Sequence, residues 1–144
     1  MNNQDTIHLL KECDAGSKMA VTSLDEIMED AKDEKLKEVI IKSKDHHTKL
    51  GNEIHSMLIH YHCEEKDPNP MAKSMSWLKT NMKMSMDKSD ATVADLLTDG
   101  CNMGIKSLYK YMNQYPSAND KVKNLCNHLI DIERELREDL REYL

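Results

Sequence analysis

The sequence predicts an all-α protein: a four-helix bundle built from two helical hairpins joined by a long crossover that contains a short extra helix. Apolar residues recur every three or four positions over most of the 144 residues, as in helices that bury one face. The composition, with no Phe, four Gly, three Pro and 32% charged residues, favours long solvated helices over sheets with many turns. A repeated motif indicates that the same hairpin occurs twice.

The repeat is clearest in two short motifs. Cys13-x-x-Gly16 returns as Cys101-x-x-Gly104, and several residues on either side return at the same offset. Self-similarity over such a length indicates a tandem structural unit. We therefore expect one domain, with hairpin one over residues 5–63, the crossover over 64–89 and hairpin two over 90–144.

The first hairpin follows from two apolar stripes. One stripe runs from about Asp5 to Ala31, and Asp33 and Glu34 then restart a helix with acidic residues in its first turn, where the helix dipole favours them. The second helix should end near Cys63, because the prolines that follow cannot continue it. Its predicted inner face is Leu36, Ile40, Ser43, His47, Leu50, Ile54, Met57 and Tyr61.

The crossover carries a methionine-rich stripe beside Trp77, at a spacing that predicts a short helix between Pro70 and Lys88. The stripe consists of Met71, Met75, Leu78, Met82 and Met86. Core packing is one interpretation of it, and an adaptable surface that docks a protein or a membrane is another.

The second hairpin begins at about Asp90, with Asp90 or Thr92 as the expected cap, and its first helix stops at Pro116. The last helix starts around Ser117 or Asn119. Its predicted inner face is Val122, Cys126, Leu129, Glu133, Leu136, Leu140 and Tyr143.

Charge and cysteine usage exclude several classes of protein. The net charge of −6 argues against nucleic-acid binding, which needs a concentrated basic face. No apolar run approaches the ~20 residues of a membrane span. The four cysteines show no paired spacing and no secretory leader is visible, so we expect reduced thiols in the cytoplasm.

Duplicated hairpins with a long crossover resemble the ferritin-like superfamily, especially its small bacterial four-helix bundles of uncharacterised role. The crossover with Trp77, followed by Asp-Gly-Cys-Asn-Met-Gly-Ile-Lys-Ser-Leu-Tyr at residues 99–109, is similar to the second half of those proteins. The resemblance implies inward Glu residues on the first and third helices and Glu-x-x-His on the second and fourth, which together cage two iron ions. Glu-x-x-His occurs nowhere in this chain, so the resemblance implies a degenerate di-iron site.

Gly16 and Gly104 occupy the positions where the resemblance places the lone Glu ligands. Each glycine inside a helix costs about 1 kcal/mol relative to Ala, so each calls for an explanation. One explanation is close helix packing, in which a bulky partner fills the space of the missing side chain. The other is that these positions once held something larger.

His47 and Glu133 are equivalent positions of the two hairpins and both lie on predicted inner faces. We expect them to face each other, because a buried carboxylate needs a partner. A hydrogen-bonded pair, aided by Lys44 and water, is one interpretation. A weak iron, zinc or copper site that adds Cys13 or Cys101, two thiols expected to lie close together, is the other.

His60 and Cys63, three residues apart near the end of the second helix, form a second weak metal cluster. Nothing in the sequence supports nucleophilic catalysis, since there is no Gly-x-Ser-x-Gly motif and no phosphate-binding glycine loop. We therefore expect a non-enzymatic binding or structural protein without a required cofactor, which acts on an unknown protein partner or by self-association. A metal-binding or redox protein is the alternative, and a docking module built on the crossover is the second alternative.

Overall fold

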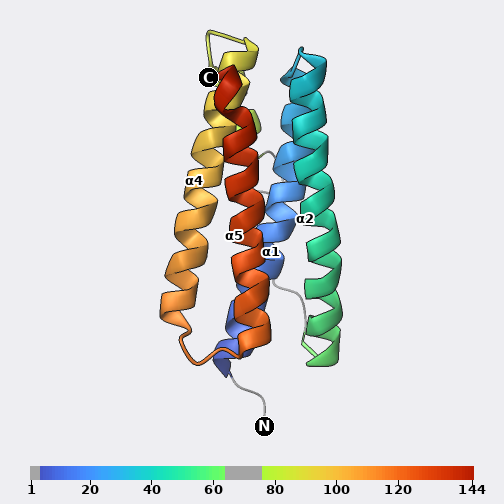
Figure 1. Cartoon of the computed structure of the whole chain (residues 1–144), viewed down its shortest axis with the longest axis vertical. Coiled ribbons are helices and arrows are strands. Elements are labelled where there is room, and N and C mark those ends of the chain that lie inside the picture. The colour runs from blue at the N-terminus through green and yellow to red at the C-terminus, as the bar shows by residue number, and fades with distance from the viewer. Residues whose placement is uncertain (1–3, 64–75) are drawn as a thin grey trace.

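The computed structural model describes residues 4–63 and 76–144, and within these ranges it contains helices and no strand (Figure 1). The helices are α1 (Gln4–Ile27), α2 (Glu34–His60), α3 (Trp77–Met84), α4 (Asp90–Gln114) and α5 (Asp120–Leu140), with short 3₁₀ turns η1 (Met28–Asp30) and η3 (Arg141–Tyr143). The predicted all-α class is confirmed for the described residues.

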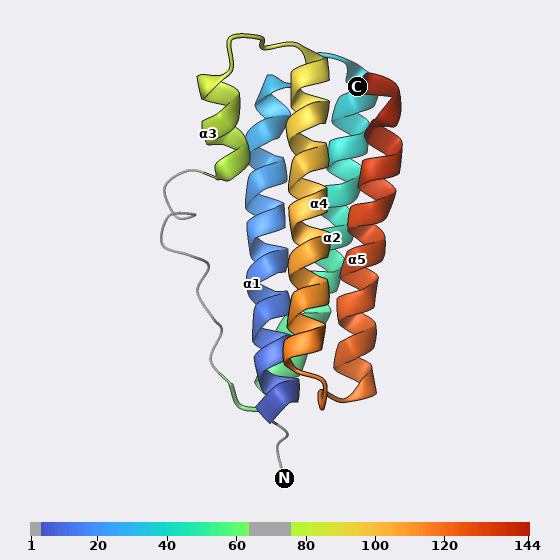
Figure 2. The ribbon, with the colours of Figure 1, turned by 90° about the vertical axis from the view of Figure 1, so that its left-hand side faces the viewer.

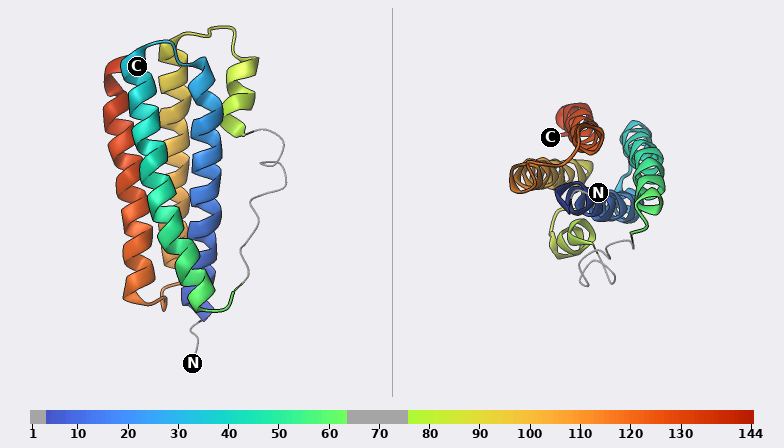
Figure 3. Two further views of the ribbon diagram at one scale, coloured as in Figure 1. Left: turned by 90° about the vertical axis from the view of Figure 1, so that its right-hand side faces the viewer. Right: turned by 90° about the horizontal axis from the view of Figure 1, so that it is seen from below.

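The four long helices form two antiparallel hairpins that lie side by side. α1 runs away from the N-terminus and α2 returns, whereas α4 begins at the far end beside α3 and α5 returns to that end (Figure 2). The helices α2 and α4 therefore run in the same direction. Seen along the bundle, α3 lies outside the four long helices, next to α1 (Figure 3).

Side-chain caps fix where the helices begin. Asp33 accepts from the backbone N–H of Leu36 at the start of α2, and Asn119 does the same for Val122 in α5, so both helices begin where the sequence places their starts. The expected cap of α4 is wrong, because Ser89 caps this helix rather than Asp90 or Thr92. The Asp90 carboxylate instead accepts from the backbone N–H groups at residues 32 and 33, at 2.7 and 3.0 Å, and so ties α4 to the α1–α2 turn.

The apolar core is divided into two clusters, one toward each end of the bundle. One cluster includes Leu10, Ile54 and Leu129, and the other includes Ile27, Ile40 and Leu97. The predicted inner faces are largely buried, although Leu58 is buried where Met57 and Tyr61 were expected, and both of these are half-buried. The fold thus leaves the middle of the bundle outside both clusters.

α3 is shorter than the predicted crossover helix. Leu78 and Met82 are buried in the core, but the helix ends at Met84, so Met86 leaves the stripe and is fully exposed. Met71 and Met75 lie outside the described residues.

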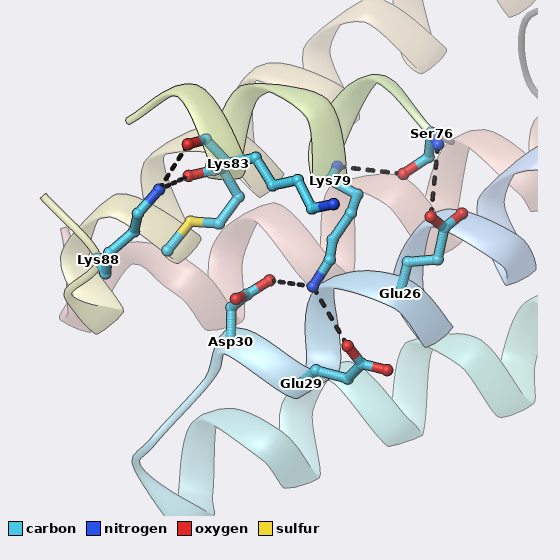
Figure 4. A network of polar contacts seen from close by, with 8 residues as sticks. Glu26, Glu29, Asp30, Ser76, Lys79, Lys83 and Lys88 are labelled. Atoms are coloured by element: carbon cyan, nitrogen blue, oxygen red, sulfur yellow. Dashed lines mark hydrogen bonds and ion pairs between the residues drawn. The ribbon is translucent and has the colours of Figure 1, made fainter. Parts of the chain in front are cut away.

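Polar contacts hold α3 against the end of α1 (Figure 4). Lys79 Nζ lies 2.9 Å from Asp30 Oδ2 and 3.2 Å from Glu29 Oε2, and the backbone N–H of Ser76 donates to Glu26 at 3.5 Å. The bond to Asp30, with a smaller contribution from Glu29, raises the pKa of Lys79 above its ordinary value. This contact fixes α3 beside the groove between α1 and α4.

The expected close packing at Gly16 is not found. Gly16 is exposed, and a Cβ atom added there would meet no atom within 4 Å. Gly104 is half-buried, and its added Cβ would meet the Glu133 carboxylate at an ordinary 3.7 Å. The glycine that does permit close packing is Gly51 on α2, where an added Cβ would lie 2.8 Å from Ser17 Oγ.

The different surroundings of Gly16 and Gly51 predict that alanine stabilises the protein at the first position and not at the second. Gly16→Ala should raise the free energy of unfolding by about 0.5–1 kcal/mol, because it gains helix propensity without a clash. Gly51→Ala should give no gain, because the new methyl group displaces Ser17 from a buried hydrogen bond of about 1 kcal/mol. Urea denaturation followed by circular dichroism measures both, and equal gains from the two variants would contradict the packing described.

Lys79→Met should lower the free energy of unfolding by about 0.5–1 kcal/mol at neutral pH. The folded-state pKa of Lys79 is raised above the unfolded value of about 10.4, so its contribution is complete below that pH and is lost as the pH rises through the folded-state pKa. The difference between wild type and variant should therefore shrink in strong alkali. Lys83→Met, at an exposed side chain of the same helix, is the control. A difference that stays constant with pH would rule out the ion pair as its cause.

Candidate polar centre and cavity

A buried polar layer separates the two apolar clusters, and His47 and Glu133 are its centre. His47 is 2% exposed and Glu133 13%, and His47 Nε2 lies 2.8 Å from Glu133 Oε1. α2 and α5 bring them together from equivalent positions of the two hairpins. The expected contact across the core is present.

The ring of His47 is not fully satisfied by this contact. Neither ring nitrogen has a hydrogen-bond partner among the described residues, because the carboxylate oxygen lies off the direction in which Nε2 would donate. Ser43, one turn earlier on α2, also has a buried hydroxyl oxygen without a partner there. Lys44, expected to help, instead pairs with Asp25 at 2.7 Å on the surface. The centre therefore retains unused hydrogen-bonding capacity in a place where that is costly.

α1 supplies polar side chains to the same layer. Ser17 Oγ donates to the His47 carbonyl oxygen at 3.1 Å, and Asp14, 1% exposed, lies 3.0 Å from Lys18 Nζ. These residues, rather than Gly16, form the inner face of α1 at this level. A glycine has no side chain to bury, so its position in an apolar stripe does not show which face of the helix points toward the core.

The cysteines are arranged differently from the expectation. Cys101 lies beside Glu133, and burial, followed by the charge of that carboxylate, raises the pKa of its thiol far above the usual value. Cys13 pairs with Cys126 rather than with Cys101, and this hydrogen bond together with burial raises the pKa of Cys13. Cys126 in turn donates to the Leu108 carbonyl oxygen at 3.8 Å. Cys13 and Cys101 belong to different core clusters, and the partner of Cys13 is Cys126 and not Cys101.

An open cavity of about 700 Å³ lies between α1 and α4, and the polar pair forms part of its floor. The cavity exists because the facing sides of these two helices carry small residues. They are Ala15, Gly16 and Ala20 on α1 and Gly100 and Gly104 on α4. Leucines from α1, α3, α4 and α5 line the cavity as well, together with methionine, aromatic and a few serine and threonine side chains, and a mainly apolar lining is usual for a small-molecule site.

The mouth of the cavity is lined by larger, partly exposed side chains. Trp77 of α3 is 46% exposed and lines one end, and Tyr111 and Met103 of α4 line the other parts of the rim. Trp77 is also the single tryptophan of the sequence, so its fluorescence reports on the cavity. α3 is thus a wall of the site as well as a cover for the core.

The predicted metal ligands are only partly brought together. His47, Glu133 and Cys101 are neighbours, but the described residues contain no group of three or more His, Cys, Asp or Glu side chains arranged to hold a metal ion. At the second cluster α2 ends at His60, so Cys63 lies beyond the helix, after a residue with a positive φ of 56° at His62. The helical spacing expected between His60 and Cys63 is therefore lost, and the Cys63 thiol donates to the Tyr61 carbonyl oxygen.

Two features of the site are missed by the sequence reasoning. The first is the Cys13–Cys126 pair. The apolar pattern places both cysteines on inner helix faces, but the repeat relates Cys13 to Cys101, and the prediction therefore paired Cys13 with Cys101. The cavity had a signal as well, because Gly16, Ala20, Gly100 and Gly104 are all small. Nothing in the spacing showed that the two runs of small residues face each other.

Comparisons with protein-family models, with curated proteins and with solved structures find no match to this chain. No helix in the described ranges combines the length and the apolar character that crossing a bilayer requires.

The burial of the thiols predicts their reactivity. Cys63 is half-buried while the other three cysteines are buried, so one thiol per native chain should react quickly with DTNB and three only after unfolding. Cys63→Ser should remove the fast phase. Fast reaction of two or more thiols in the native state would contradict this arrangement.

Proposed function

We propose that this protein is a non-enzymatic, ferritin-like helical bundle with a degenerate metal centre, which binds a small, largely apolar molecule in the cavity between α1 and α4. The observation that carries the proposal is the cavity of about 700 Å³ with a buried, incompletely satisfied His47–Glu133 pair at its floor. A cavity of this size accommodates a ligand of drug-like dimensions.

Two features support the ferritin-like relationship. The helices α2 and α4 run in the same direction, as two hairpins joined by a connection along the bundle require. The polar layer lies midway along the bundle, where such proteins hold their metal ions, and contains the His47 imidazole and the carboxylates of Glu133 and Asp14. Gly16 and Gly104 line the cavity, so the space that carboxylate ligands would occupy is open.

A binding role agrees better with these residues than catalysis does. The floor groups are a paired imidazole and carboxylate, and the adjacent Cys101 thiol is held protonated because burial and Glu133 raise its pKa. A protonated thiol is a poor nucleophile. The four free cysteines suit a reducing compartment such as the cytoplasm.

A neutral fluorescent probe tests the binding proposal. N-phenylnaphthylamine, uncharged at neutral pH, should bind with saturation at one molecule per chain. Gly16→Leu should weaken it about tenfold or more, because the new side chain enters the open space of the cavity without a clash in the helix.

Asn52→Leu is the matched control. It adds the same side chain at an exposed position of α2 that does not line the cavity, so it should leave probe affinity unchanged. Circular dichroism checks that both variants remain helical. Equal probe affinity in wild type and Gly16→Leu would overturn the proposal.

A further inference from the structure

The apolar walls of the cavity favour an apolar ligand body. The polar groups of its floor determine which polar group that ligand should carry. Glu133 is a largely buried carboxylate, and a carboxylate oxygen can only accept hydrogen bonds. His47 touches it at 2.8 Å without a linear hydrogen bond, so acceptor positions on the carboxylate remain open. A buried carboxylate in this state is stabilised by any donor that reaches it.

His47 completes the floor as a neighbour of Glu133 and not as a second acceptor. Its Nε2 lies 2.8 Å from Glu133 Oε1, and a nitrogen in that position carries its hydrogen toward the carboxylate. Both ring nitrogens are buried from solvent, so a bound molecule does not reach them. The Glu133 carboxylate, whose side chain is 13% exposed and lines the cavity, is therefore the acceptor that a ligand can meet.

The charges around the cavity have one sign. Glu12 and Glu133 line it, and no Lys or Arg does so in the described part of the chain. The side chains of the nearby cations bond outside the cavity lining: Lys18 with Asp14 at 3.0 Å, and Arg137 with Asn102 at 2.8 Å. An anionic ligand such as a fatty acid would therefore bring its charge toward the Glu133 carboxylate with no lysine or arginine among the lining residues to bind it.

We infer that the cavity selects a primary amine with an apolar body, bound as its ammonium ion with the charged group against the Glu133 carboxylate. An ammonium group carries three N–H donors and no acceptor, which matches a carboxylate that only accepts. The apolar body lies along the leucine walls, and Trp77 and Tyr111 at the rim add aromatic faces that tolerate a cation as it enters. This inference rests on the proposed binding function and names the ligand class for the same cavity.

Three molecules of equal chain length test it: decylamine, decanol and decanoate, each kept below the concentration at which it aggregates. Trp77 fluorescence at neutral pH reports binding, since no other tryptophan contributes. The amine should bind about tenfold or more tightly than the alcohol, because it forms a charge-assisted hydrogen bond, and the acid should bind most weakly.

Glu133→Gln is the decisive variant. It keeps the shape of the side chain while removing its charge, so the preference for the amine over the alcohol should fall to about threefold or less. Glu12→Gln, at the rim, should leave most of the preference in place.

The outcomes separate the two proposals. If decanol binds as tightly as decylamine to wild type, or if Glu133→Gln keeps the full preference, the ammonium inference is wrong while the cavity still binds apolar molecules. If none of the three binds in a manner that Gly16→Leu weakens, the binding function itself is wrong.

Discussion

The buried contact between His47 and Glu133 is the constraint on which the rest of this structure depends. It places an imidazole and a carboxylate, 2.8 Å apart, in the middle of a bundle whose two ends are apolar. An unpaired buried carboxylate costs several kcal/mol, so α2 and α5 must stay in register for the pair to form. Any slip of one helix by a turn would bury both groups against leucine, and the polar layer therefore fixes the relative position of the two hairpins.

The cavity forms because the helices around that polar layer carry side chains of unequal size. α2 and α5 contribute the larger polar side chains to the floor, whereas α1 and α4 face each other with glycines and alanines. Close-packed interiors rarely leave space of this size, and an unfilled space forfeits dispersion contacts on every wall. The opening between α1 and α4 is thus a local loss of packing, and it lies where the Glu133 carboxylate of the floor lines the cavity.

The sequence was a good guide wherever one local rule decided the outcome. The start of α2 at residues 33 and 34, the start of α5 near Asn119 and the contact between His47 and Glu133 all follow from periodicity, the residue types at helix starts and the internal repeat. Prediction failed where the outcome depended on how a helix is rotated about its own axis, because that rotation decides which side chains face a neighbouring helix. Gly16 has no side chain to indicate an inward face, and Cys13 meets Cys126 instead of its repeat partner Cys101. The helix end at His60 depends on a residue with positive φ, which no pattern of apolar residues reveals.

The internal repeat explains why the floor is chemically asymmetric. If both copies had kept the same residue at this level, the core would hold two imidazoles or two carboxylates, and two like charges in contact would not both ionise. One copy carries the imidazole and the other the carboxylate, so the pair is compatible with burial. The glycines, by contrast, are the same in both copies, at Gly16 and Gly104, which keeps the space above the pair open from both sides. Divergence at residues 47 and 133 and identity at the two glycines together produce a cavity with one polar end, a form that suits an amphiphilic molecule.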